Sequence, residues 1–136
     1  HIPEIEQELA DRALQPVAIS FTPHLVPMNR GELVTIYLTL AQHHSADDAR
    51  AILDRSYKDM PFVQFLPDGV IPSTRWVRGS NQCHIGLFED RIPGRIILVA
   101  ALDNLVKGSS GQAIQNFNLM AGLDPQTGLQ QIAMFP

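Results

Sequence analysis

The feature that most restricts the fold is an apolar run from Arg95 to Leu102, in which both faces of an extended strand are apolar. Such a strand must be covered on both sides, so we expect it at the centre of a sheet. Residues 31–40 form a second strand pattern with one strongly apolar face. Both runs fall well short of the roughly 20 apolar residues that cross a bilayer. The sequence therefore predicts a soluble domain built around a sheet.

Helical and extended patterns surround these two strands. Helices are expected over about residues 3–14, 46–58 and 111–121, and further strands over residues 61–66 and 82–88. Residues 17–26 favour an edge or irregular strand, because Pro23 and the following Pro27 cannot donate to a central ladder. Residues 70–81 lack periodicity and are expected to form a long, functional loop. Because helices and strands do not strictly alternate, we predict an α+β fold with a mixed, mostly antiparallel sheet and helices on one face.

Composition narrows the class of protein. The 136 residues, 45% of them hydrophobic, suit one domain with one sizeable core. A net charge of −4 gives no electrostatic reason to expect nucleic acid or an anionic membrane as partner. The only cysteine, Cys83, excludes an internal disulfide and fits a reducing cytoplasm. Because the chain begins at His1, directly in a helical pattern and without a leader, we expect it to be part of a longer polypeptide.

The histidines do not have the spacing of a metal site. They are His1, His24, His43, His44 and His84. His43 and His44 are adjacent, whereas ligands on one helical face lie three or four residues apart, so we expect solvated loop or strand-end histidines and no metal. Cys83 and His84 are neighbours in a strand and point to opposite faces, so they cannot act as nucleophile and base. A buried structural cysteine is favoured.

Residues 103–113 (DNLVKGSSGQA) carry the most informative local chemistry. A central strand enters a polar turn with glycines and Lys107, and a helix follows. Free N–H groups, the helix dipole and the lysine would favour an anion. The lysine precedes the glycines, so this is not a Walker motif. Alone, the segment fits a phosphate contact or a flexible helix entry equally well.

Four segments resemble, in order, the C-terminal part of the N-acetyl-gamma-glutamyl-phosphate reductase family, NADP-dependent enzymes of arginine biosynthesis. They are residues 1–7 (HIPEIEQ), 21–31 (FTPHLVPMNRG), 77–83 (VRGSNQC) and 103–113. The resemblance implies a two-domain subunit, with a Rossmann domain that binds the nucleotide before a substrate-binding and dimerisation domain similar to that of glyceraldehyde-phosphate dehydrogenases. Residues 1–136 would be this second domain, and residues 104–136 a C-terminal helix and tail that pack on the nucleotide domain.

The resemblance also implies the chemistry. A cysteine attacks the acyl phosphate of a small-molecule substrate, and hydride from NADPH reduces the thioester to a semialdehyde. Cys83 does not match that cysteine, which would lie outside these residues, so the fragment would be inactive alone. The family's motif His-x-His-x-Pro-Glu places its second histidine at His1 and its glutamate at Glu4, which implies catalytic roles for both. Whether His1 or the first histidine of the motif is the acid/base stays open.

Further site residues are expected along the chain. Arg30 and Arg78 are candidate substrate contacts, because a guanidinium group binds a carboxylate or phosphate through two hydrogen bonds. A structural ion pair is an equal alternative for each. The family's last helix implies Asn104, Lys107 and Gly111 on the side of the NADP, which the N-terminal domain mainly binds, and we expect a homo-oligomer. The alternatives are a stand-alone dimerisation or ligand-binding module, or the same domain of another semialdehyde dehydrogenase.

Overall fold

The computed structural model describes residues 1–134. Its elements are helix α1 (Ile2–Ala13), strand β1 (Glu32–Thr39), helix α2 (Ala46–Tyr57), strand β2 (Val63–Phe65), the short 3-10 helix η1 (Thr74–Trp76), strands β3 (Cys83–Glu89) and β4 (Arg95–Leu102), the π-helical turn η2 (Val106–Ser110) and helix α3 (Gly111–Met120). The last two residues of the segment 104–136 predicted as helix and tail lie outside the described residues. No helix within residues 1–134 has both the length and the apolar character needed to cross a membrane.

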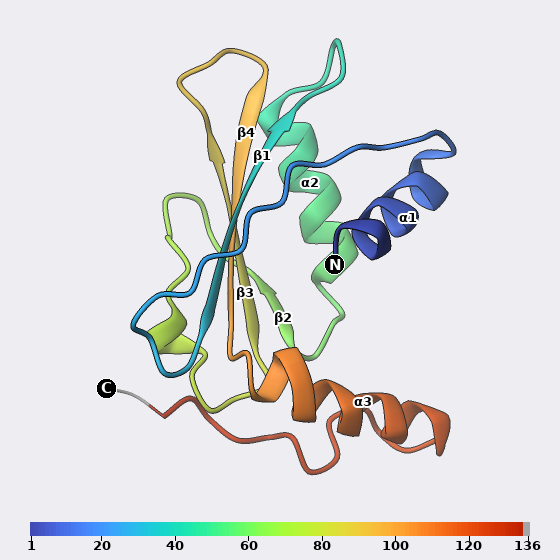
Figure 1. Cartoon of the computed structure of the whole chain (residues 1–136), viewed down its shortest axis with the longest axis vertical. Helices are drawn as coiled ribbons and strands as arrows, with labels where there is room; N and C mark the ends of the chain where they lie inside the picture. The colour runs from blue at the N-terminus through green and yellow to red at the C-terminus, as the bar shows by residue number, and fades with distance from the viewer. Residues whose placement is uncertain (135–136) are drawn as a thin grey trace.

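The sheet has the strand order β1-β4-β3-β2 (Figure 1). β4 pairs antiparallel with both β1 and β3, and β2 pairs parallel with β3. The apolar strand Arg95–Leu102 is therefore central, as predicted, and Ile96 and Ala101 are buried within it. The α+β class with a mixed, mostly antiparallel sheet is confirmed.

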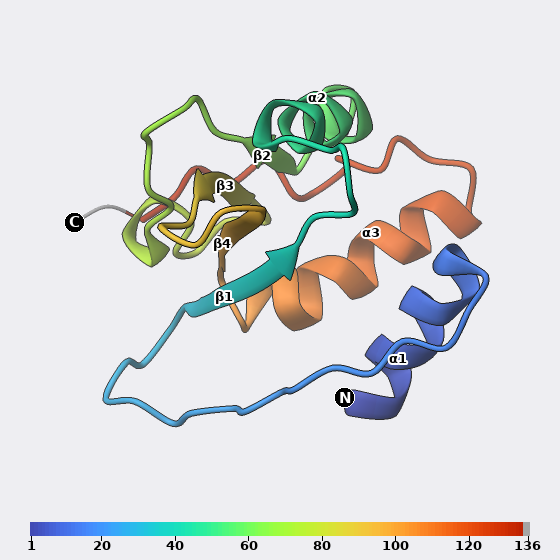
Figure 2. The same ribbon diagram turned by 90° about the horizontal axis from the view of Figure 1, so that it is seen from above.

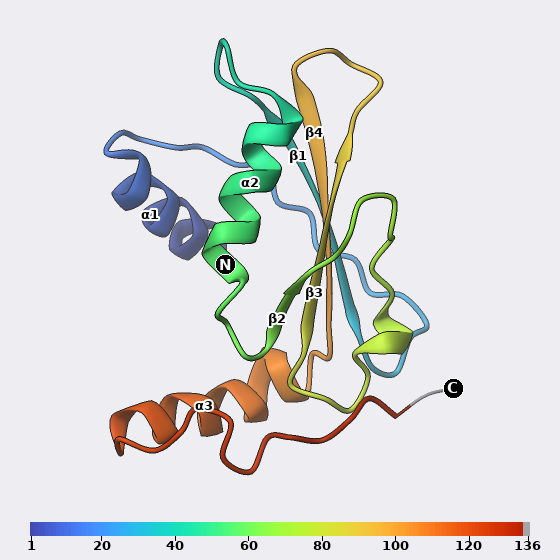
Figure 3. The same cartoon turned by 180° about the vertical axis from the view of Figure 1, so that it is seen from behind.

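The three helices lie on the same side of the sheet (Figure 2). α2 covers β2 and β3, and its Arg50 lies over the Phe65 ring and donates to the Leu87 carbonyl at 2.9 Å. Ser45 starts α2 with a capping box, since its hydroxyl accepts from the Asp48 N–H and Asp48 accepts from the Ser45 N–H. α1 and α3 extend away from the sheet (Figures 1 and 3).

The opposite face of the sheet is covered by the loop between β2 and β3 and by the C-terminal tail. An added Cβ on Gly86 of β3 would lie 2.8 Å from the Pro72 ring, so this loop packs directly on the strand. The tail returns from α3 beneath the sheet (Figures 1 and 3), buries Leu129, and its Met134 N–H donates to the Arg78 carbonyl at 2.7 Å.

The structure corrects the edge or irregular strand predicted over residues 17–26. The segment is extended but pairs with no strand within residues 1–134, and it runs along the outside of the molecule from α1 toward β1 (Figure 2). Pro23 removes a donor that a ladder would need, and Leu25 is fully exposed. β1 and β2 are therefore the two edge strands of the described sheet.

Candidate functional site

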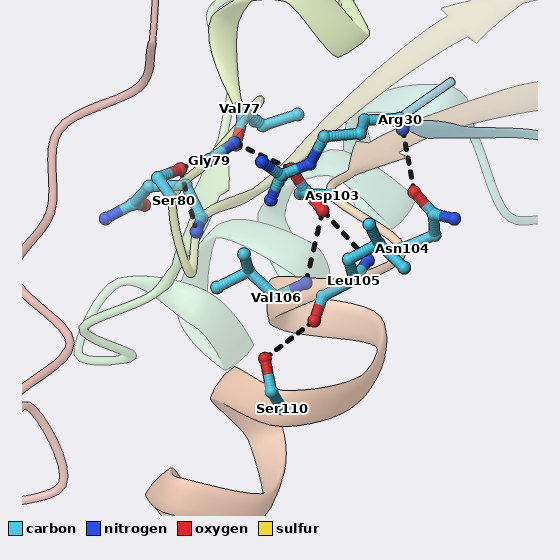
Figure 4. A network of polar contacts seen from close by, with 11 residues as sticks. Arg30, Val77, Gly79, Ser80, Asp103, Asn104, Leu105, Val106 and Ser110 are labelled. Carbon is cyan, nitrogen blue, oxygen red and sulfur yellow. Dashed lines mark hydrogen bonds and ion pairs between the residues drawn. The ribbon is translucent and has the colours of Figure 1, made fainter. Parts of the chain in front are cut away.

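Three of the four motif segments meet where β4 ends, around the side chain of Asp103 (Figure 4). This carboxylate is fully buried. Its Oδ1 accepts from the N–H groups of Leu105 at 2.8 Å and Val106 at 3.1 Å. Its Oδ2 accepts from the Gly79 N–H at 2.6 Å and pairs with Nη2 of Arg30 at 3.0 Å. One carboxylate thus joins residues 21–31, 77–83 and 103–113.

A neighbouring contact strengthens the same connection. The Gly31 N–H donates to Oδ1 of Asn104 at 2.8 Å. Gly31 has a φ of 112°, and an added Cβ would lie 2.7 Å from Cβ of Thr74, so both backbone and space require glycine there. We call Arg30, Gly31, Gly79, Asp103 and Asn104 the Asp103 junction.

The Asp103 junction keeps its carboxylate charged. Burial alone would raise the pKa of Asp103, but the N–H groups of Gly79, Leu105 and Val106, together with the Arg30 guanidinium, outweigh burial and lower that pKa below its ordinary value. Asp103 is therefore an anion at neutral pH, and Arg30 makes the structural ion pair that was one of its two alternatives.

The helix entry within residues 103–113 is an ordered turn and not the flexible entry that was one of its two alternatives. The Gly108 N–H donates to the Asp103 carbonyl at 2.9 Å, and the Ser110 N–H donates to the Leu105 carbonyl at 3.2 Å. Because the Asp103 side chain caps the first N–H groups, helical turns begin before Gly111. The entry is a π-helical turn, and the N–H groups of Leu105, Val106, Gly108 and Ser110 within it are bonded by the chain itself.

Lys107 and Gly111 lie on the α3 side of the junction. An added Cβ on Gly111 would collide with the buried amide oxygen of Asn81, so glycine serves close packing here. The Asn81 amide nitrogen and the Lys107 ammonium both donate to Oε1 of Gln115, at 3.1 Å and 2.9 Å. The ammonium also lies 5.7 Å from the centre of the Phe62 ring, and burial lowers the pKa of Lys107.

Arg78 differs from Arg30. Its Nε is buried and has no hydrogen-bond partner within residues 1–134, and no acidic group in this part of the chain pairs with it. The Nε of Arg30 is also buried without a partner. Each guanidinium group therefore retains donors that the described residues do not use.

His1 and Glu4 are placed elsewhere. His1 Nδ1 lies 3.4 Å from a carboxylate oxygen of Glu4, both side chains are 79% exposed, and the imidazole contacts the Phe21 ring edge-on at 6.2 Å. The pair lies at the start of α1, away from the end of β4 (Figures 1 and 3). Residues 1–134 therefore bring Glu4 to His1 but do not bring either residue to the Asp103 junction.

The remaining histidines and Cys83 differ in how deeply their side chains are buried. His43 and His44 are exposed, as predicted, but His84 is buried, which corrects the expectation of solvated histidines. The loop between β2 and β3 covers its side of the sheet, and burial lowers its pKa. Cys83 is half-buried, and burial raises the pKa of its thiol against the opposing effect of Lys107. Within residues 1–134, no three His, Cys, Asp or Glu side chains gather as a metal site would require.

The sequence analysis missed Asp103 as the centre of the site. The available signal was an acidic residue directly after a buried strand, two and three residues before the N–H groups that it accepts from. Asn81 and Gln115 were also missed, because their contact joins a loop to α3 and has no local signature.

Comparison with known families gives a match over residues 1–104 to the semialdehyde dehydrogenase dimerisation domain. The chain belongs to this family. Over all 136 residues it is 55% identical to the N-acetyl-gamma-glutamyl-phosphate reductase of Geobacter sp. (strain M21) and 54% identical to that of Citrifermentans bemidjiense. It is 52% identical to the probable chloroplastic N-acetyl-gamma-glutamyl-phosphate reductase of Arabidopsis thaliana. The chain spans 39% of the two bacterial relatives and 34% of the plant relative.

The Asp103 junction lies at the C-terminal end of the matched dimerisation domain. The family match ends at residue 104, whereas the similarity to the reductases continues through α3 to residue 136. Asp103 and Asn104 are the last residues of the matched domain, and they hold the start of the segment that follows it. A dimerisation domain also implies an oligomer, and β1 exposes apolar side chains such as Leu33 and Tyr37.

Proposed function

We propose that these 136 residues are the catalytic and dimerisation domain of an NADP-dependent N-acetyl-gamma-glutamyl-phosphate reductase of arginine biosynthesis, acting in the cytoplasm. The observation that carries the proposal is the alignment of every residue with such reductases at 55% identity. The convergence of three motif segments on Asp103 supports it, because these segments then serve one site. The nucleotide-binding domain and the nucleophilic cysteine would lie in the remaining length of the subunit, so the 136 residues alone would be inactive.

In this proposal Arg30 and Arg78 bind the anionic phosphate or carboxylate of the acyl phosphate. Both guanidinium groups retain an Nε that no residue within 1–134 engages. Arg78 has no acidic partner within residues 1–134, so its positive charge is available to attract an anion. Glu4 orients the His1 imidazole, as their 3.4 Å contact favours, so that this end of the domain can hold a proton for the reaction.

The proposed cofactor side comprises Asn104, Lys107 and Gly111. Lys107 fits a contact to a cofactor phosphate or carboxamide, because its ammonium uses one donor on Gln115 and carries a charge. Asn104 and Gly111 shape this surface. The side-chain oxygen Oδ1 of Asn104 accepts from the Gly31 N–H, and Asn81 fills the space beside Gly111. When bound, NADPH supplies the hydride.

Two exposed apolar surfaces support the proposed partners. On β1, Leu33 and Tyr37 are 54% and 60% exposed, and we assign this strand to contacts between subunits of a homo-oligomer. On α3, Phe117 and Met120 are 63% and 88% exposed, and we assign this helix, with the tail, to the nucleotide-binding domain of the same subunit. Burying such side chains is favourable by about 25 cal/mol per Å² of apolar surface.

The test compares the complete subunit with the 136-residue chain. We expect the complete subunit to oxidise NADPH with N-acetyl-glutamyl phosphate, and the short chain to show no turnover but to self-associate in sedimentation experiments. Aspartyl phosphate serves as the control substrate and should react poorly. A complete subunit that prefers aspartyl phosphate would indicate another semialdehyde dehydrogenase, and one that reduces no acyl phosphate would favour a binding module.

A further inference from the structure

We infer that Asp103 is a positioning residue for anion binding, which orients the Arg30 guanidinium and fixes the loop that carries Arg78. The inference rests on the proposed function, in which these two arginines hold the substrate anion. Asp103 itself, buried and negatively charged, would not touch the substrate.

One oxygen atom of Asp103 binds both the segment with Arg30 and the loop with Gly79. Oδ2 of Asp103 lies 3.0 Å from Nη2 of Arg30 and accepts from the Gly79 N–H at 2.6 Å (Figure 4). Oδ1 is held by the N–H groups of Leu105 and Val106, so the carboxylate cannot rotate without losing those bonds. The direction of the Arg30 fork is therefore set by the end of β4.

The unused donors point to a ligand. Nε of Arg30 and Nε of Arg78 are both buried without a partner within residues 1–134, whereas native proteins satisfy nearly all such groups. Asp103 occupies one end of the Arg30 guanidinium and leaves Nε free, and its bond to Gly79 holds the residue next to Arg78. The oxygens of a phosphate or carboxylate group are the acceptors that such donors bind best.

A second ion pair in the same protein shows what a purely local arrangement looks like. Arg95 donates from Nε to Asp90 at 2.5 Å, and its guanidinium lies over the Tyr37 ring. The other Asp90 oxygen accepts from the nearby Ile92 N–H. This pair closes the hairpin between β3 and β4 and holds no second loop, so Asp90→Asn is a matched control for Asp103→Asn.

The experiment uses the complete reductase subunit and follows the reverse reaction. In that direction the aldehyde loses hydride to NADP⁺, phosphate displaces the enzyme thiol from the thioester, and acyl phosphate, NADPH and a proton are formed. We expect Asp103→Asn to raise the KM for inorganic phosphate about tenfold, through the loss of an oriented charge-assisted contact. We expect kcat and the KM for NADP⁺ to stay within about threefold. Asp90→Asn should leave all three unchanged.

A double variant tests whether Asp103 affects phosphate binding through Arg30. Because Asp103 acts partly through Arg30, adding Asp103→Asn to Arg30→Gln should raise the KM for phosphate by clearly less than it does in the wild type, and the remaining rise reports the loop that carries Arg78. If Asp103→Asn does not fold, Arg30→Lys keeps a charge beside Asp103 but removes the fork, and should raise the same KM about tenfold.

The outcomes separate the inference from the proposed function. A wild-type subunit without activity overturns the proposed function and this inference with it. An active wild type, with an Asp103→Asn variant that melts at a lower temperature but keeps its KM for phosphate, overturns the inference alone. An unchanged KM in Arg30→Lys does the same.

Discussion

The two ends of β4 each carry a carboxylate–guanidinium pair, and the two pairs do different work. Before the strand, Asp90 and Arg95 lie five residues apart and close a hairpin. After the strand, Asp103 pairs with Arg30, which arrives from before β1. The arginines are similarly exposed, at 29% for Arg30 and 34% for Arg95. Charge and burial are thus alike, and the difference lies in what else each carboxylate holds.

The two carboxylates differ in the backbone N–H groups that they bind. Asp103 accepts from Gly79, Leu105 and Val106, so its loss would release a distant loop and a helix entry together. Asp90 accepts from Ile92, so its loss would loosen one turn. The same kind of ion pair therefore closes a turn at one end of the strand and joins three of the four motif segments at the other.

The largest expected effect is on Asp103→Ala. It should lower the free energy of unfolding by about 3–5 kcal/mol, because it leaves the Arg30 charge and three N–H groups without their acceptor. Asp90→Ala should lower it clearly less, because the Asp90 carboxylate holds one nearby turn and no distant segment. Urea unfolding followed by circular dichroism measures the free energy of unfolding of both variants, and equal losses would contradict this difference.

Glycines near the two ends of β4 should also differ in how well they tolerate a side chain. Gly111→Ala should destabilise by about 1–3 kcal/mol through overpacking, although alanine is the better helix former. An added Cβ would lie 2.8 Å from Cγ1 of Val106. Gly94, in the hairpin, has a φ of 75° and nothing within 4 Å, so Gly94→Asn should cost less than about 1 kcal/mol. A Gly111→Ala variant as stable as wild type in thermal melts would contradict the close packing at Asn81.

The pH dependence should separate the pairs next. The pKa values of Asp103 and Asp90 are both lowered in the folded state. The unfolded chain then binds more protons in acid, so both groups stabilise the fold above about pH 4 and lose this contribution as the pH falls. We expect Asp103→Asn to flatten the acid dependence of the unfolding free energy more than Asp90→Asn, because more N–H groups favour its charged form. Unfolding titrations between neutral and acid pH supply the slopes, and the reverse order would contradict this account.

Salt should have the smallest effect. Screening shortens the range of exposed charge interactions to about 3 Å at 1 M salt, but it acts weakly on buried pairs. Because the Asp90 and Asp103 side chains are 7% and 0% exposed, the destabilisation caused by Asp90→Asn and by Asp103→Asn should each change little as salt is added. Unfolding curves at low and high salt test this, and a salt-sensitive Asp103 variant would indicate a solvated junction.

Local and periodic features of this fold were predictable from the sequence. The run Arg95–Leu102 is apolar on both faces, and it became the central strand β4. Ser45 and Asp48 have the spacing of a capping box, and α2 begins with one. In both cases the deciding interactions lie within one element or follow from its own pattern of burial.

Features made by distant contacts were not predictable. Residues 17–26 have strand-forming side chains, but pairing depends on a partner edge, and none accepts them within residues 1–134. The close packing at Gly111 was not predictable either, because Asn81 lies against it from a loop distant in the sequence. The position of His1 and Glu4 relative to the Asp103 junction also depends on tertiary packing, which no local pattern encodes.

A double-mutant cycle measures how strongly Asp103 and Arg30 are coupled in the folded protein. The free energy of unfolding is measured for wild type, Asp103→Asn, Arg30→Gln and the double variant, with Asp90→Asn and Arg95→Gln as the matched cycle. We predict a coupling energy of about 2 kcal/mol between Asp103 and Arg30, within the range for directly paired groups, and a smaller coupling in the hairpin. A coupling between Asp103 and Arg30 below about 0.5 kcal/mol, as found for independent sites, would contradict the account.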